Sequence, residues 1–187
     1  IDMDSVGVNG LLAAIAAELG ASLLLTPEQS DKARGSVREL ATASKMMFLS
    51  RRRGSAPKDL GIDLLILKDK RFRETGYERE IEVGVEVLEP LDEGRFHMDE
   101  KGWFRILLGR EEGKIVLLHH LTGEEERADL ILKSARAEPL CIAAIERGLV
   151  SRLDHAAYLG RELGKAEIAL STGKTYIQDD PLFPEAH

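Results

Sequence analysis

The stretch ASLLLTPEQSDKARGSVRELATASKMMFLS, residues 21–50, decides the expected fold of the N-terminal part of the chain. It opens with an apolar run at 21–25, whose length and composition are those of a strand buried on both faces. A polar turn follows, and Ser36 with Glu39 three residues later forms a capping-box pattern that predicts a helix start. The helix is expected to end near Arg53, where cations meet the negative end of the helix dipole.

The segments on either side repeat this alternation of helix and strand. Residues 8–19, VNGLLAAIAAEL, are rich in Ala and Leu and are followed by Gly20, so we expect a helix that ends there. Its apolar residues lie almost all round, which is typical of a buried helix. Residues 62–67, IDLLIL, predict a second apolar strand. The order helix, strand, helix, strand indicates a parallel α/β layer.

The pattern then changes to strands that alternate polar and apolar residues. Residues 80–88, EIEVGVEVL, have period two and predict a half-exposed strand. Three more strand-like runs follow at 95–98, 102–108 and 114–121, separated by turns that contain Gly. This spacing is typical of an antiparallel meander.

Two helices are predicted after the meander. One covers 129–147, with an interruption at Pro139, and the other covers 152–171, with Ser151 as its N-cap. Residues 175–179 are expected to add a short edge strand. The expected fold class is therefore α/β and α+β: short parallel strand–helix units, then an antiparallel β-meander and two C-terminal helices.

The composition excludes several classes of protein. Hydrophobic residues make up 43% and charged residues 32%, which is the balance of a soluble globular domain. The net charge of −7 and the aromatic content of 5% argue against a nucleic-acid partner. No apolar run approaches the ~20 residues that span a bilayer, so we expect no membrane partner. Cys141 is the only cysteine, which excludes an intrachain disulfide and suits the cytoplasm.

Two histidines and a helix face are the other candidates for chemistry. His119 and His120 are adjacent in a predicted strand, so they point to opposite faces, one to the core and one to water. We therefore expect no metal there. His155, Tyr158 and Glu162 share one face of the last helix, where they form either an acid–base or ligand site or a polar packing face. A polar cluster with Tyr176, Gln178 and Asp179 would fix the last segment onto that helix without a ligand.

Two stretches carry a family resemblance. DMDSVGVNGLLAAIAAELGASLLLTPEQSDKARGSVRELATASKMMFL resembles the end of the barrel in archaeal dihydropteroate synthase-related proteins. FHMDEKGWFRI and LDHAAYLGRELGKAEIALSTGKTYIQD resemble the small domain of unknown function that ends the same proteins and also occurs alone. The resemblance implies that 1–60 are the last βα units of a pterin-binding barrel and that 61–187 are that small domain. The chain starts with Ile1 and not Met, so we expect a piece of a longer protein or a processed form.

The resemblance also implies an activity. The intact protein would join a dihydropterin diphosphate to an arylamine and release pyrophosphate, in archaeal folate or methanopterin biosynthesis. The loops after the last barrel strands often bind phosphate. The implied contacts to a pterin diphosphate or another anionic small molecule are Ser30, Lys32, Arg34, Ser36 and Asn9.

Two departures from the family limit this expectation. The Arg-x-His pair of the bacterial enzymes is absent from the last strand, and the pterin-binding Asp and Asn residues of the family belong to strands outside this chain. We therefore assign no catalytic residue, expect no cofactor, and expect the isolated chain to be inactive. The alternative is a non-catalytic ligand-binding, oligomerisation or interaction module. A separate pterin or corrinoid-related pocket at His155, Tyr158 and Glu162 also stays open, as does a homo-oligomeric state.

Overall fold

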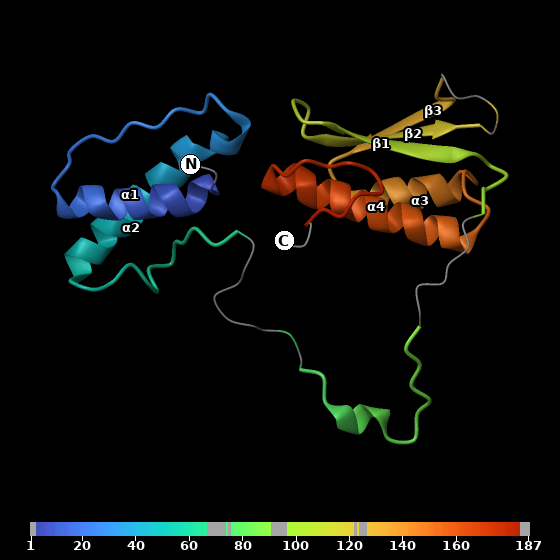
Figure 1. Ribbon diagram of the computed structural model, residues 1–187, viewed down its shortest axis with the longest axis horizontal. Coiled ribbons are helices and arrows are strands. Elements are labelled where there is room, and N and C mark those ends of the chain that lie inside the picture. The colour runs from blue at the N-terminus through green and yellow to red at the C-terminus, as the bar shows by residue number, and fades with distance from the viewer. Residues whose placement is uncertain are drawn as a thin grey trace. The chain divides into compact units, whose positions relative to one another are not determined.

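The computed structural model describes residues 3–66, 74, 76–90, 97–121, 123 and 127–183. The chain forms two compact units, Ile1–Tyr77 and Glu78–His187, and each is described by itself. The domain division expected at residue 60 stays a prediction. The elements are α1 (Ser5–Glu18), α2 (Ser36–Arg53), β1 (Trp103–Gly109), β2 (Lys114–His120), β3 (Leu130–Ser134), α3 (Ala137–Glu146) and α4 (Leu153–Thr172), with 3-10 turns at Asp31–Ala33 and Arg79–Glu82 (Figure 1).

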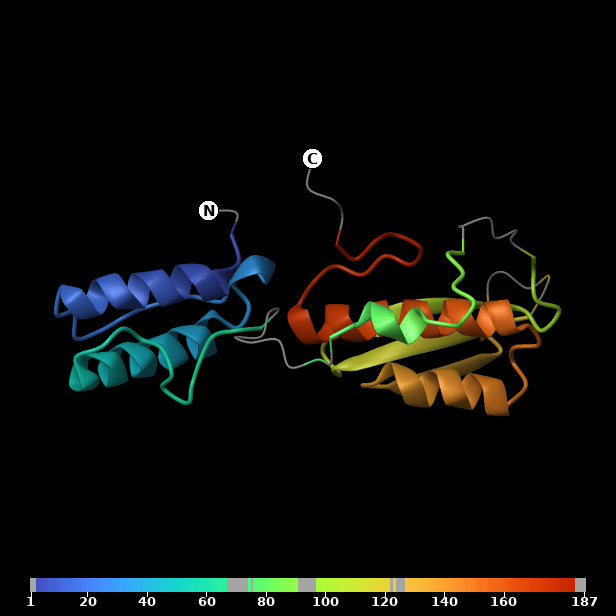
Figure 2. The ribbon, with the colours of Figure 1, turned by 90° about the horizontal axis from the view of Figure 1, so that it is seen from below.

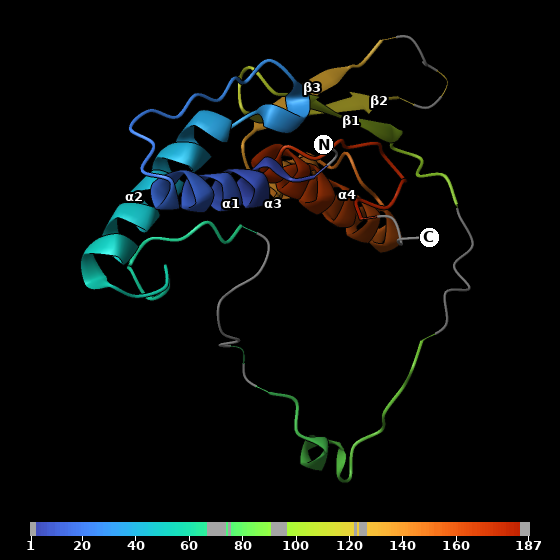
Figure 3. The same ribbon diagram turned by 60° about the vertical axis from the view of Figure 1, so that its left-hand side comes forward.

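The first unit is built on the helix pair α1 and α2, which lie side by side (Figures 1 and 3). Ala13 and Ala43 are buried between them, and their small side chains allow the two backbones to approach closely. Asn9 on α1 is also buried, and its Nδ2 donates to Glu39 Oε2 on α2 at 2.9 Å. α1 ends at Glu18, and Gly20 just after it has a φ of 71°, which lets the Ala21 N–H donate back to the Ala16 carbonyl oxygen at 2.9 Å.

The start of α2 differs from the predicted capping box. Gly35 occupies the N-cap position instead of Ser36. The Val37 N–H donates to Glu28 Oε1 at 2.8 Å, so a side chain from the preceding turn caps the helix. The Glu39 carboxylate bonds Asn9 instead of reaching back to the cap. A capping box is therefore the wrong prediction here, because a tertiary contact with α1 uses the same carboxylate.

The two strands predicted in the first unit are wrong. Residues 21–25 and 62–66 form no helix or strand and belong to no sheet, and residue 67 lies outside the described residues. Leu23 is 87% exposed and Leu25 is 95% exposed, so the run is not buried either. An isolated strand has no neighbour to satisfy its backbone N–H and C=O groups, and the described part of this unit contains no strand to pair with. The expected burial of α1 is also wrong, since Leu11 is 65% exposed and Leu12 is 54% exposed.

The second unit is a layer of two helices on a three-stranded antiparallel sheet in the order β1-β2-β3. Figures 1 and 2 show α3 and α4 on the same face of the sheet. Ile115 and Leu117 of β2 meet Leu159 and Leu163 of α4 in the core, and all four are essentially fully buried. The meander predicted at 102–108 and 114–121, the C-terminal helices and the mixed α and β class are confirmed.

Three element predictions in the second unit need correction. The helix predicted at 129–147 is instead β3, which pairs with β2, followed by α3. Pro139 does not interrupt a helix, because it lies in the first turn of α3 where the missing N–H breaks no helical bond. Residues 80–88 begin as a 3-10 turn and then form no strand, with Val83 81% exposed. Of the strand predicted at 95–98, residues 97 and 98 belong to no strand and the rest lie outside the described residues.

Candidate functional site

The predicted anion-binding turn presents three of its side chains to solvent. Ser30 and Lys32 are exposed beside the 3-10 turn at Asp31–Ala33. The Arg34 guanidinium lies 3.2 Å from Asp31 Oδ1, and both side chains are largely in water. An exposed ion pair of this kind contributes little stability, so Arg34 can leave Asp31 for another anion at small cost.

The other two predicted residues have a structural role. Asn9 lies inside α1, away from the turn that holds Ser30, Lys32 and Arg34. Its Nδ2 reaches the Ser36 carbonyl oxygen at 3.5 Å as well as the Glu39 carboxylate, and both Asn9 and Ser36 are buried. The structure therefore brings Asn9 and Ser36 together as a link between the two helices and leaves Ser30, Lys32 and Arg34 on the surface.

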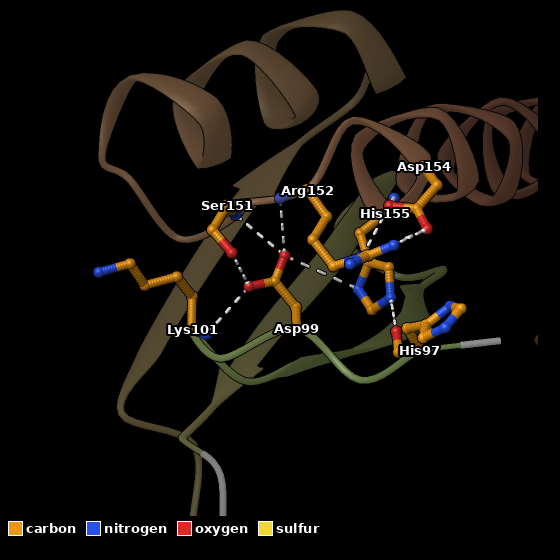
Figure 4. A network of polar contacts seen from close by, with 7 residues as sticks. All are labelled: His97, Asp99, Lys101, Ser151, Arg152, Asp154 and His155. Atoms are coloured by element: carbon orange, nitrogen blue, oxygen red, sulfur yellow. Dashed lines mark hydrogen bonds and ion pairs between the residues drawn. The ribbon is translucent and has the colours of Figure 1, made fainter.

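A buried carboxylate in the second unit holds the start of α4 (Figure 4). Asp99 is 2% exposed. Its Oδ2 accepts the backbone N–H groups of Ser151 at 2.9 Å and Arg152 at 3.1 Å. Its Oδ1 accepts the Ser151 hydroxyl at 2.5 Å and the Lys101 N–H at 2.9 Å. The prediction that Ser151 is the N-cap is wrong, because Arg152 occupies that position and Asp99 supplies the acceptors from another segment.

The same bonds fix the charge of Asp99. Burial alone would raise its pKa, but the Ser151 hydroxyl and the backbone N–H groups of Lys101, Ser151 and Arg152 outweigh burial and lower the pKa well below the ordinary aspartate value. The carboxylate therefore stays ionised at the positive end of the α4 dipole. His155 Nδ1 lies 3.8 Å from Asp99 Oδ2, and His155 Nε2 contacts the His97 carbonyl oxygen. Figure 4 shows both ring nitrogens directed at groups of the chain itself.

A second buried carboxylate fixes the segment after α4. Glu162 has no exposed surface, and its Oε1 lies 2.6 Å from Lys165 Nζ. Its Oε2 accepts the Tyr176 hydroxyl at 3.0 Å and the Asp179 N–H at 3.3 Å. The Tyr158 hydroxyl donates to Asp179 Oδ1 at 2.7 Å. Figures 1 and 2 show the segment folding back beside α4, so the polar cluster expected to fix it there is confirmed.

Both tyrosines in this network titrate high. Burial raises the pKa of Tyr158 to about 12, and the neighbouring Asp179 and Glu162 charges act in the same direction. Burial also raises the pKa of Tyr176, and the Glu162 carboxylate that accepts its hydroxyl adds to the rise. Each phenol is therefore a hydrogen-bond donor at neutral pH and is not an acid or base that exchanges protons there.

Gln178 covers the outer edge of the sheet. Its Oε1 accepts the Ile106 N–H at 3.0 Å and its Nε2 donates to the Phe104 carbonyl oxygen at 3.0 Å. The edge strand predicted at 175–179 does not form, but one side-chain amide makes the two bonds that a neighbouring strand would make with β1. The bond from Arg110 to the Lys174 carbonyl oxygen holds the same segment further along.

The three residues predicted as one helix-face site therefore divide between two networks. His155 belongs to the Asp99 network, and Tyr158 and Glu162 belong to the network of the C-terminal segment. Sequence reasoning missed Asp99, because nothing in the sequence shows that a residue 52 positions before Ser151 accepts its N–H. Within the described ranges, no group of three or more His, Cys, Asp or Glu side chains is placed to hold a metal ion.

The adjacent histidines are both buried, which corrects the prediction that one faces water. His119 is 3% exposed and its Nδ1 lies 2.8 Å from Asp129 Oδ1. His120 is 4% exposed, and its ring stacks on Trp103 with 4.2 Å between the ring centroids. The two rings contact different neighbours, as expected for opposite faces of a strand, and the stacked indole replaces water over His120.

Comparison with known proteins finds one matching family and two similar proteins. Residues 98–179 match the family described as PterinBD-DUF4346. An uncharacterized protein of the archaeon Methanocaldococcus jannaschii is 44% identical over 185 residues, which are 97% of this chain and 34% of that protein. A Ycf91-like protein of Nostoc sp. is 38% identical over 86 residues, which are 44% of this chain and 63% of that protein. No solved structure matches the chain.

These matches relate the second unit to a known family and show how much of its relatives the chain covers. The second unit contains a segment related to a family whose description names pterin binding. The chain spans about a third of the length of the archaeal relative and less than two thirds of the Nostoc protein. Among the described residues, no helix is long and apolar enough to cross a membrane.

Proposed function

We propose that this chain is the C-terminal part of a pterin-pathway transferase, in which the turn around Lys32 and Arg34 contacts the diphosphate of a dihydropterin substrate. The carrying observation is the match of 98–179 to a pterin-binding family in a chain that shares almost its whole length with a much longer archaeal relative. The reaction proposed for the longer protein is the condensation of a dihydropterin diphosphate with an arylamine in folate or methanopterin biosynthesis.

The surface of the first unit supports a place inside a larger domain. A groove lies between α1, α2 and residues 21–26, and its lining includes Ala17, Leu40 and Met47. The neighbouring Leu23 and Leu25 are exposed. Apolar surface of this kind marks a contact site. In the proposal, further strands of a (β/α)8-type barrel pair with 21–25 and cover these leucines, and the turn that follows then lies on the barrel rim.

The chemistry of the rim follows from the charges that the turn presents. When the bond between the pterin methylene and the diphosphate breaks, negative charge builds up on the leaving diphosphate. Cations placed at that position stabilise the transition state more than the ground state. Lys32 is an exposed lysine, and Arg34 supplies a guanidinium that contacts the exposed Asp31. Ser30 adds a hydroxyl donor beside them.

A second candidate function applies to the second unit, and the two α4 networks favour it. Asp99, Tyr158 and Glu162 all bond groups of the chain itself, so the polar side chains that a sequence would nominate for catalysis have structural partners. This favours a non-catalytic interaction or oligomerisation module attached to the enzyme. The pterin in the family description would then belong to the domain to which the module is attached.

Isothermal titration calorimetry with inorganic pyrophosphate tests the proposed diphosphate contact at the turn around Lys32 and Arg34. We expect weak, saturable binding with a Kd in the range of about 1 mM, since one loop supplies the contacts. Lys32→Ala and Arg34→Ala should each weaken binding about tenfold or more, because each removes one charged contact. Lys45→Ala is the matched control, since this lysine is exposed on α2 outside the turn. Absence of binding by the unmodified chain, or an equal loss in the control, would contradict the rim and leave the module.

A further inference from the structure

We infer that the second unit docks an acidic amphipathic helix of a partner protein on the free face of its sheet. Helix α4 covers β1 and β2, and α3 covers β3, both on one side (Figures 1 and 2). Of the helices and strands in the described part of the unit, none lies on the other side, here called the open face (Figures 1 and 2). The inference rests on the second candidate function, the interaction module, and is independent of the proposed diphosphate contact.

The open face is apolar at its centre, where a solvated face would be polar. An antiparallel sheet with one packed face normally turns polar residues to water on the other. Here Val116 and Leu118 of β2 point outward, because Leu117 between them lies in the core. The register places Leu107 opposite Val116 and Ile131 opposite Leu118, so these two share the face and are 42% and 53% exposed. A contiguous apolar patch of this kind marks a contact surface.

Cations stand on both sides of this apolar centre. Arg105 of β1 lies opposite Leu118, and Lys133 of β3 lies opposite Val116. Residues that lie opposite each other in antiparallel strands share a face, so one cation flanks the row of β2 on each side. Lys114 follows Val116 on the same face of β2 by alternation and is exposed at the end of the row.

The sign of these charges selects an acidic partner. The chain carries a net charge of −7, so a basic face has the opposite sign to the molecule as a whole. Lys133 contacts Glu112 at 3.2 Å, and both side chains are about half exposed, so a carboxylate of a partner can replace Glu112 at small cost. A second copy seated face to face would bring like charges together, which disfavours it.

The arrangement of the charges selects a helix over a strand. A strand that covered the apolar row with every second side chain would turn its alternate, charged side chains away from the sheet. An amphipathic helix has an apolar stripe with polar residues along both borders, so its border carboxylates reach cations on either side of the row. The distance across three strands is about 10 Å, which is the diameter of one helix. The stripe then covers Val116 and Leu118, and the borders meet Arg105 and Lys133.

Two synthetic peptides without tryptophan test the docking on the full chain. Both have about 18 residues and the same helical leucine stripe, and the borders of the stripe carry Glu in one and Lys in the other. Trp103 reports binding by its fluorescence, because it is the only tryptophan and lies on the open face opposite His120. We expect the Glu peptide to bind with a Kd of about 10–100 µM, since one helix makes a small interface, and the Lys peptide to bind at least about tenfold more weakly. No binding of the Glu peptide, or equal binding of both, would overturn the inference.

Substitutions on the open face make the test specific to this surface. Ile131→Asp and Arg105→Glu should each weaken binding of the Glu peptide about tenfold, and Arg105→Glu combined with Lys133→Glu should reverse the preference between the two peptides. These positions are exposed, so far-UV circular dichroism should match that of the parent. Arg147→Glu is the matched control, since it changes an exposed cation at the end of α3 in the helix layer. Unchanged affinity in the face variants, or an equal loss in the control, would overturn the inference.

Two other occupants of the face have distinct outcomes in the same experiments. If the parent self-associates in sedimentation velocity and Ile131→Asp makes it monomeric, a second copy covers the face. That result would overturn the partner helix and leave an oligomerisation module. If a uridine oligonucleotide changes Trp103 fluorescence at a lower concentration than the Glu peptide does, the face binds nucleic acid, and the inference is overturned as well.

Discussion

Replacement of Asp99 tests the role of the buried carboxylate that holds α4. Asp99→Ala removes four hydrogen bonds at 2.5–3.1 Å and leaves three backbone N–H groups with no acceptor in a site that is 2% exposed. Loss of one partner in a buried charged network costs about 3–5 kcal/mol. Asp99→Asn keeps one carbonyl oxygen, which still accepts two of the four bonds, so its cost should be about half, ~2 kcal/mol.

Urea denaturation followed by Trp103 fluorescence measures the effect. The single tryptophan lies in the second unit, so its signal reports the unit that Asp99 stabilises. Asp154→Asn is the control, because Asp154 lies in the same helix turn and its partner Arg152 is exposed, and it should unfold near the parent midpoint. The reasoning would be refuted if Asp99→Ala unfolded within about 1 kcal/mol of the parent, which is the range of ordinary surface changes.

The pH dependence of Asp99 has a defined sign. Its pKa in the folded chain lies below the ordinary value of 3.8, so the folded state binds its proton less readily than the unfolded state. The stability that Asp99 contributes is complete above that ordinary value and is lost as the pH falls below it. The difference between the parent and Asp99→Asn should therefore shrink in acid. A constant difference from neutral pH down to pH 3 would contradict the assignment.

Three further changes have expected outcomes. Gly102→Ala should lower the stability of the second unit, measured in urea, by at least about 3 kcal/mol. A Cβ at this position, where φ is 121°, would lie 2.0 Å from the His120 carbonyl oxygen. Gly164→Ala in α4 places its Cβ in open space and should raise stability by up to about 1 kcal/mol. Tyr158 has a pKa of about 12, above the ordinary 10.0, so its contribution to stability should be complete below pH 10 and lost as the pH rises toward 12. Phenolate absorbance follows its ionisation, and ionisation at pH 10 would contradict its burial. Gln178→Ala should speed hydrogen exchange of the β1 amides and cost about 1–3 kcal/mol, since it removes two bonds to the sheet edge; unchanged exchange would contradict the edge role.

The sequence predicted elements whose pattern is local. The alternation in 102–108 and 114–121 and the apolar stripe of α4 correspond to β1, β2 and α4, because each of these faces is buried against a partner within the chain. The run 129–147 was predicted as one helix, but the apolar residues of a short segment fit either a helix or a strand until pairing decides. Pairing with β2 made its first part a strand.

Non-local contacts limited the rest. Residues 21–25 have the composition of a buried strand, but the described chain offers no neighbouring strand, so composition alone did not produce one. The role of Asp99 depends on a contact across 52 residues, and that of Gln178 depends on a contact across 72. The polar cluster around Glu162 was predictable because helical spacing places Tyr158, Glu162 and Lys165 on one face.

Pyrophosphate release from a dihydropterin diphosphate and an arylamine tests the central proposal most directly. The assay compares this 187-residue chain with a hybrid in which it replaces the matching 34% of the archaeal relative. We predict no turnover by the chain alone, turnover by the hybrid, and a loss of about 100-fold or more in the hybrid with both Lys32→Ala and Arg34→Ala. Turnover by the chain alone, or a hybrid whose rate is unchanged by the two substitutions, would contradict the account.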